Sequence, residues 1–129
     1  MEIQMEIDQL ENELSLKTIT KSLLPRFVNL ASITIPSNIL IIEDSIFTHC
    51  PSLSTIFVHS NNSQFISIDG ILFTKNFETL LCFPAKHQLS SYTIPPNVTS
   101  IGNYAFFRCY ILRSITIPTS VISIGKSAF

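Results

Sequence analysis

A 23-residue repeat constrains this 129-residue chain more than any other feature. Residues 89–106 and 112–129 share every apolar column when the second stretch is set back by 23 positions. Both stretches contain the dipeptides Ile-Pro, Ile-Gly and Ala-Phe, and the first residues of these dipeptides form the matching pairs Ile94/Ile117, Ile101/Ile124 and Ala105/Ala128. A unit of this length cannot bury its apolar side alone, so each unit must stack on the next one.

Further copies follow the same columns. A third copy starts at Leu30 and ends with Cys50, which follows Phe47 by three residues as Cys109 follows Phe106. Five units are predicted: a degenerate first repeat at 7–29, then 30–52, 53–88, 89–111 and a truncated unit at 112–129. In domain terms, residues 1–29 combine an N-terminal cap with the degenerate repeat, and residues 30–129 form the solenoid.

The unit at 53–88 carries 13 extra residues. Two apolar runs, 71–73 and 80–83, flank a polar loop at 74–79, which predicts a β-hairpin inserted into the solenoid. Within this unit, Phe65, Ile68 and Phe73 keep the internal spacing of Val98, Ile101 and Phe106, so we expect them to continue those columns.

Alternation near the start of each unit predicts short strands that stack into a parallel sheet. The predicted strands are 33–35, 56–58, 92–94 and 115–117, and the proline after most of them ends the ladder. The stretch after each glycine column is too short for a stable independent helix, so we expect one helical or 3₁₀ turn there. Phe47, Phe106 and Phe129 share a column and are predicted to stack as an aromatic spine.

Two structures are open for the N-terminus. The 4-3-4 spacing of Ile3, Ile7, Leu10 and Leu14 favours an amphipathic cap helix over 2–13, with repeat-like structure from 14 onwards. The alternative extends the degenerate repeat through the same residues. Residues 1–16 carry five acidic and no basic residues, which is unlike a secretory signal, and no apolar run is long enough to span a bilayer.

Composition narrows the functional classes. Charged residues make up only 13% of the chain and the net charge is −1, which argues against nucleic-acid binding and against a disordered tail. The sequence has no phosphate-binding glycine loop, nucleophile elbow or zinc-protease motif. We therefore expect no catalytic site, no cofactor and no metal.

The three cysteines are expected to be packed free thiols. They are too few, and odd in number, for a disulfide scaffold. His49 and Cys50 are adjacent, but no second ligand pair at metal-binding spacing accompanies them. Cys50 and Cys109 share a column that predicts small buried side chains, and Cys82 lies in the hairpin.

The spacing L-x-x-I-x-I-P-x-x-V-x-x-I-G-x-x-A-F-x-x-C resembles the BspA-type leucine-rich repeat, and residues 68–84 resemble its longer, hairpin-bearing form. Glu43 and Asp69 replace the glycine of that pattern, and Ile46 replaces its alanine. The resemblance implies a leucine-rich-repeat solenoid that attaches to a host cell or to matrix at a cell surface. The alternatives are an intracellular protein-interaction scaffold and a repeat fragment with no independent function.

The outward positions of the strands form the surface that the repeat itself specifies, where solenoids usually bind partners. The candidate binding face consists of Thr34, Thr55, Phe57, His59, Ser91, Thr93, Ser114 and Thr116, with Ser32, Glu11 and Glu13 extending it towards the N-terminus. Phe57 is the one aromatic residue on a polar ladder; we expect the hairpin to cover it, and an interface anchor is the alternative.

The expected partner is a protein, from a host, from matrix or another copy of this chain. Nothing follows Phe129 to shield the last repeat, which predicts end-to-end self-association there if the chain is not part of a longer array. Two N-x-S/T sequons, at Asn61 and Asn97, matter only if the protein is exported.

Overall fold

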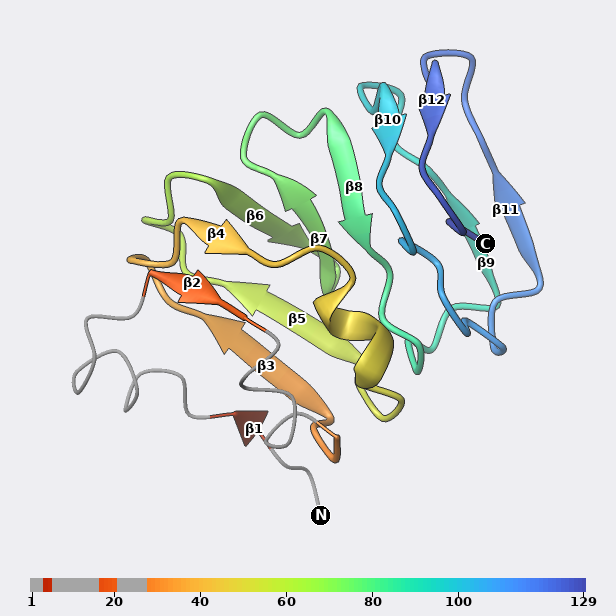
Figure 1. Cartoon of the computed structure of the whole chain (residues 1–129). Coiled ribbons are helices and arrows are strands. Elements are labelled where there is room, and N and C mark those ends of the chain that lie inside the picture. Colours follow the sequence, from red (N-terminus) through yellow and green to blue (C-terminus); the bar gives the residue numbers. More distant parts are fainter. Residues whose placement is uncertain (1–3, 6–16, 21–27) are drawn as a thin grey trace.

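The structure is a computed structural model that describes residues 4–5, 17–20 and 28–129. These residues form a β-solenoid of stacked, mostly parallel strands with very little helix (Figure 1). The solenoid predicted from the repeat is therefore confirmed. Its strands belong to two ladders, one at the start of each repeat and one in its middle, and an antiparallel insertion interrupts both.

The first ladder contains the strands predicted from the alternating Ile columns. It comprises β1 (Gln4–Met5), β3 (Ser32–Ile35), β5 (Thr55–Val58), β9 (Ser91–Thr93) and β11 (Ser114–Thr116). Two neighbouring pairs, β3–β5 and β9–β11, are parallel at the predicted 23-residue offset, with Ile33 opposite Ile56 and Ser91 opposite Ser114. One expectation is wrong: these strands do not form one continuous sheet, because β1–β3–β5 and β9–β11 are separate.

The second ladder follows the turn after the proline. It comprises β2 (Thr18–Ile19), β4 (Ile41–Ile42), β10 (Ser100–Ile101) and β12 (Ser123–Ile124). It is also divided, into the pair β2–β4 and the pair β10–β12, which belongs to a five-stranded sheet that the insertion completes.

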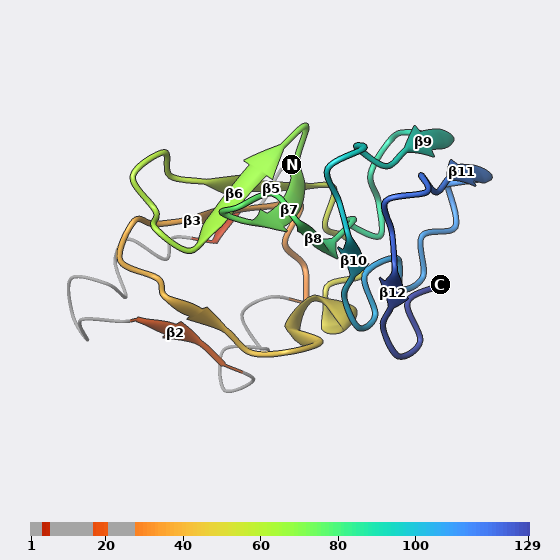
Figure 2. The same cartoon turned by 90° about the horizontal axis from the view of Figure 1, so that it is seen from above.

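The insertion causes both breaks. It consists of β6 (Phe65–Ile68), β7 (Ile71–Thr74) and β8 (Thr79–Cys82). The predicted hairpin is confirmed as the antiparallel pair β7–β8, which has a register shift between Leu72 and Phe73. Viewed from above, the insertion lies between the N-terminal repeats and the two C-terminal ones (Figure 2).

Strand β6 was not predicted, and it changes which residue of the insertion lies opposite Ile101. Asp69 and Gly70 both have positive φ and form a tight turn that pairs β6 antiparallel with β7. Ile101 therefore stands opposite Leu80 of β8, and the expectation that Ile68 continues the Ile101 column is wrong.

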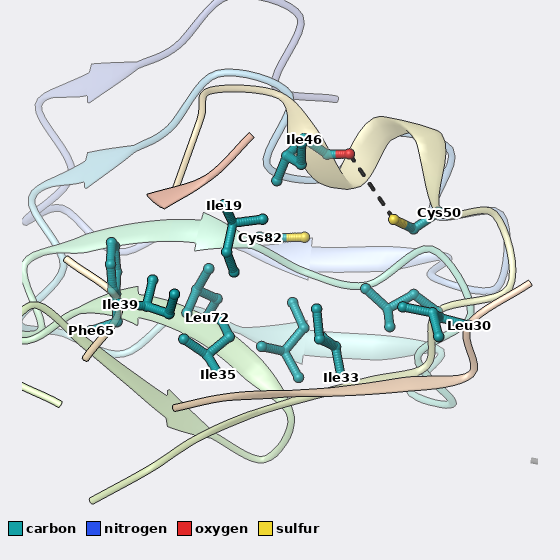
Figure 3. Packing of buried hydrophobic residues seen from close by; sticks show 12 residues of the cluster. Ile19, Leu30, Ile33, Ile35, Ile39, Ile46, Cys50, Phe65, Leu72 and Cys82 are labelled. Atoms are coloured by element: carbon teal, nitrogen blue, oxygen red, sulfur yellow. Dashed lines mark hydrogen bonds between the residues drawn. The ribbon is translucent and has the colours of Figure 1, made fainter. Parts of the chain in front are cut away.

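The insertion also divides the core into two clusters. Leu72 packs into the N-terminal cluster, where Figure 3 shows it together with Ile33, Ile35 and Cys82. Its neighbours Ile71 and Phe73 pack into the C-terminal cluster. Strand β7 is thus buried on both faces, which explains why its sequence is a continuous apolar run and does not alternate.

The predicted aromatic spine has different members. Phe106 stacks on Phe129 and, on its other side, on Phe83 of the insertion, with ring centroids 5.0 and 5.2 Å away. Phe47 packs against the N-terminal cluster instead, so its place in the spine was wrong. The predicted 3₁₀ turn occurs as η2 (Ile46–His49).

At the N-terminus the repeat register is only partly kept. Ile19 pairs with Ile42 at the expected 23-residue offset, but Gln4 pairs with Ser32, which is 28 residues away. The helix predicted over 2–13 is wrong at Gln4–Met5, which form a strand, and its other residues lie outside the described part of the chain.

Candidate functional site

The side chains of the predicted binding face lie at the surface in two separate patches. The N-terminal patch contains Thr34, Thr55, Phe57 and His59, and the C-terminal patch contains Ser91, Thr93, Ser114 and Thr116. Thr34 and Thr55 are half-buried and the other six side chains are exposed. Ser32 is buried, so its predicted place on the face was wrong, and Glu11 and Glu13 lie outside the described residues.

The strand edge between the patches is occupied by the insertion. The amide of Ile56 donates to the carbonyl of Gly70 at 3.0 Å, and the amide of Val58 donates to Ser67 Oγ at 2.9 Å. These bonds use the edge of β5 that would otherwise pair with β9. The two patches therefore do not form the single ladder that the repeat predicts. The Asp69-Gly70 turn is the sequence feature that could have indicated this division.

Within each patch the register brings the side chains together in pairs. Phe57 lies opposite Thr34 across β3 and β5, and Thr93 lies opposite Thr116 across β9 and β11. Directly opposed side chains on neighbouring strands lie within contact distance, so each patch is a short two-strand platform.

Phe57 is the main apolar feature of the N-terminal patch. Its side chain is 51% exposed, so the insertion does not cover it and the expectation of a covered residue was wrong. His59 beside it is held in place: its amide donates to the Ile35 carbonyl at 2.9 Å, and its Nδ1 accepts from the Asn61 amide at 3.1 Å. An exposed aromatic ring on an otherwise polar, rigid surface can anchor a partner.

The metal-ligand side chains and the thiols of the described residues can be located one by one. Within the described residues, no group of three or more His, Cys, Asp or Glu side chains is placed to hold a metal ion. The cysteines are free thiols, as predicted, and burial raises the pKa of Cys50 and of Cys109 to about 12. The Cys109 thiol donates to the Phe83 carbonyl at 3.2 Å. Thiols with pKa values this high stay protonated near neutral pH and are poor nucleophiles.

The stacked parallel strands, the repeating apolar columns and the turn after each strand define a leucine-rich-repeat solenoid. The chain belongs to the family described as the BspA type leucine rich repeat region, whose sequence profile matches residues 4–82 and 81–129 as six copies. The resemblance noted in the sequence is thus confirmed. The profile has one copy more than the five units predicted from the 23-residue columns.

Three solved structures are similar to this chain, each over 78% of its length. A leucine-rich repeat protein from Eubacterium ventriosum is 32% identical with a TM-score of 0.76. The pneumococcal vaccine antigen PcpA is 28% identical with a TM-score of 0.76. A leucine rich cell surface protein from Faecalibacterium prausnitzii is 33% identical with a TM-score of 0.71.

The matched regions are short parts of those proteins. They cover 27%, 25% and 27% of the three chains, respectively. No curated protein matches the sequence significantly. In the described part of this chain, no helix has the length and apolar character needed to cross a membrane.

Proposed function

We propose that this protein is a non-catalytic binding module that attaches to a host or matrix protein at a cell surface through the N-terminal patch. The observation that carries the proposal is the half-exposed ring of Phe57 beside Thr34 and His59. Buried aromatic anchors surrounded by polar contacts dominate the energetics of many protein interfaces. Two similar structures, a vaccine antigen and a cell surface protein, support the surface location.

The location is tested by labelling intact, non-permeabilised cells with an antibody to the protein. Surface labelling supports attachment. Labelling only after permeabilisation would overturn it and favour the intracellular scaffold.

The binding face is tested by measuring capture of the purified protein on immobilised matrix proteins. Phe57→Ala is expected to weaken capture about tenfold or more, as the loss of an interface anchor does. Leu40→Ala is the matched control, because Leu40 is also an exposed apolar side chain, 42% accessible, outside both patches. Equal effects of the two substitutions would contradict the assignment of Phe57.

A second candidate function is end-to-end association of two copies. A groove of about 290 Å³ lies beside Phe129, lined by Phe106 and Leu112 and bordered by Arg108 and Arg113. The acidic segment 2–13 of a second copy complements these two arginines in charge. Sedimentation velocity over a 100-fold concentration range tests this: Arg113→Glu should abolish a concentration-dependent dimer, and an unchanged monomer at all concentrations would exclude it.

A further inference from the structure

A cleft lies on the second ladder, at the place where the insertion separates β4 from β10. Its walls are the turn from Ile42 to Thr48, which follows β4, and the turn from Gly102 to Tyr104, which follows β10. In the regular repeats these turns stack on each other 23 residues apart. Here the intervening unit has used the corresponding segment for β6 and β7, which leaves a cavity of about 120 Å³.

The floor of the cleft is apolar. Ile46, Leu72, Cys82 and Phe65 are all less than one-tenth exposed, and they line the cavity together with the partly buried Phe47 and Leu81. Figure 3 shows Ile46 on the η2 segment and Leu72 and Cys82 on the insertion. A cavity of comparable size in another protein, about 150 Å³, takes up benzene, so this one has room for about five or six heavy atoms.

The rim is polar and its main charge is negative. Asp44 is exposed, and its Oδ2 accepts a hydrogen bond from Asn103 Nδ2 at 3.0 Å, which joins the two walls across 59 residues of sequence. Asn103 is itself fixed, because its Oδ1 accepts from the Lys126 amide at 2.7 Å. Glu43 lies next to Asp44 in the same wall. Among the residues that the structure describes, no lysine, arginine or histidine lines the cleft.

One cation is nearby. The Lys126 ammonium lies 5.9 Å from the centre of the Tyr104 ring, and Tyr104 belongs to the rim. Lys126 is exposed and is not part of the cleft lining.

We propose that the cleft binds a lysine side chain of a protein partner, with its alkyl stem on the apolar floor and its ammonium beside the Asp44 carboxylate. Long basic side chains lie along apolar surface in this way while their charge stays at the water interface. The size of the cavity suits a single unbranched side chain, and the negative rim selects a cation over a neutral or acidic group. The proposal rests on the proposed function only in that the occupant belongs to a protein, and it does not involve the N-terminal patch.

The test is a titration of the ¹⁵N-labelled 129-residue protein with three small probes, followed by amide chemical shifts. The probes are N-acetyl-lysine methylamide, its norleucine analogue without the charge, and N-acetyl-glutamate methylamide. The lysine probe is expected to shift amides of residues 42–48 and 102–104 in a saturable way and at least threefold more tightly than norleucine. Equal binding of lysine and norleucine, no saturation, or shifts confined to other residues would overturn the proposal.

The variant Asp44→Asn removes the charge but keeps an acceptor for Asn103. It is expected to weaken the lysine probe by about threefold to fivefold, the size of an exposed ion pair. Glu78→Gln is the matched control, because Glu78 is an exposed carboxylate at the hairpin loop, outside the cleft lining. Equal effects of the two variants would contradict a role for Asp44.

Two more measurements keep the outcome clear. If Asp44→Asn does not fold, Leu81→Phe fills the cleft from the insertion side and should abolish the lysine shifts without touching the carboxylates. Pentane-1,5-diamine tests for a free amine: tighter binding of the diamine than of the lysine probe would overturn assignment to a protein partner. Because no probe contacts Phe57, failure here leaves the capture assay on Phe57 as an independent test of the proposed function.

Discussion

The repeats at 89–111 and 112–129 have nearly the same apolar residues and very different surroundings. Ile94 is 1% exposed and its counterpart Ile117 is 41% exposed, while Ile101 and Ile124 are 1% and 53% exposed. Ile94 and Ile101 lie against the second repeat, because the Ile94 amide donates to the Thr116 carbonyl at 3.0 Å and Ile101 pairs with Ile124. Among the residues that the structure describes, none stacks on the far side of 112–129. In a solenoid, therefore, the neighbour decides how much an apolar column contributes to stability.

The backbone shows the opposite trend. A Cβ atom added at Gly102 would lie 3.3 Å from the Leu80 carbonyl oxygen, whereas one added at Gly125 would lie 2.5 Å from the Asn103 amide nitrogen. The second repeat approaches its neighbour more closely than the first does. The burial of a side chain and the distance between neighbouring backbones therefore vary independently in this pair of repeats. Substitutions can measure the contribution of each to stability.

The largest difference is expected for the phenylalanine pair. Phe106 is 3% exposed and lies between the rings of Phe83 and Phe129, so Phe106→Ala should lower the free energy of unfolding by about 3–5 kcal/mol. Phe129 is 59% exposed, and Phe129→Ala should cost about 1 kcal/mol. Urea unfolding of both variants of the 129-residue chain measures the difference.

Equal costs would show that Phe129 is covered in solution. Repeating the unfolding at a tenfold lower protein concentration then tells whether a second copy covers it, because association makes stability depend on concentration.

The glycine pair should show the reverse order with a smaller difference. Gly125→Ala forces backbone atoms of the two repeats apart and should cost about 1–3 kcal/mol, whereas Gly102→Ala needs a small adjustment and should cost less than about 1 kcal/mol. Hydrogen exchange at the Gly125 amide, which donates to the Ile101 carbonyl at 2.7 Å, reports the local opening. An unchanged exchange rate in Gly125→Ala would contradict the close approach.

The regular repeats are the parts of the fold that the sequence predicts best. The columns predict β3, β5, β9 and β11 of the first ladder to within one residue, because a period of 23 with inward Ile at alternate positions has few alternatives. They did not predict β1, where a helix was favoured. One column holds both Gly125, where an added Cβ atom would lie 2.5 Å from the Asn103 amide nitrogen, and Glu43, which lines the cleft.

The insertion is where sequence reasoning was weakest. The run Ile71-Leu72-Phe73 predicts a strand but not that it is buried on both faces, since an unbroken apolar run does not indicate the direction of its side chains. Its unexpected partner β6 depends on the Asp69-Gly70 turn, which was interpreted as a departure from the repeat. The columns predict that Phe57 points outward, but whether the insertion covers it depends on where these strands lie, and so does the cleft at Asp44.

The smallest expected effect is on the free energy of unfolding at alkaline pH. It concerns only the repeat at 89–111. Residues 112–129 contain no cysteine, whereas the preceding repeat contains Cys109, and burial raises the pKa of its thiol from 9.0 to about 12. Below pH 9 the thiol is protonated in both the folded and the unfolded chain. Between pH 9 and 12 only the unfolded chain loses the proton, so stability falls as the pH rises.

For this half-buried thiol the loss at pH 10 should be about 1 kcal/mol after allowance for solvent screening. The measurement is the change in free energy of unfolding between pH 7 and pH 10, for the parent chain and for Cys109→Ala. Because burial and Asp69 also raise the pKa of Tyr92 to about 12, Tyr92 contributes to both proteins and cancels in the difference. If Cys109→Ala loses as much stability between pH 7 and pH 10 as the parent chain does, the Cys109 thiol is not buried in solution. The difference in burial between the two repeats then does not include residue 109.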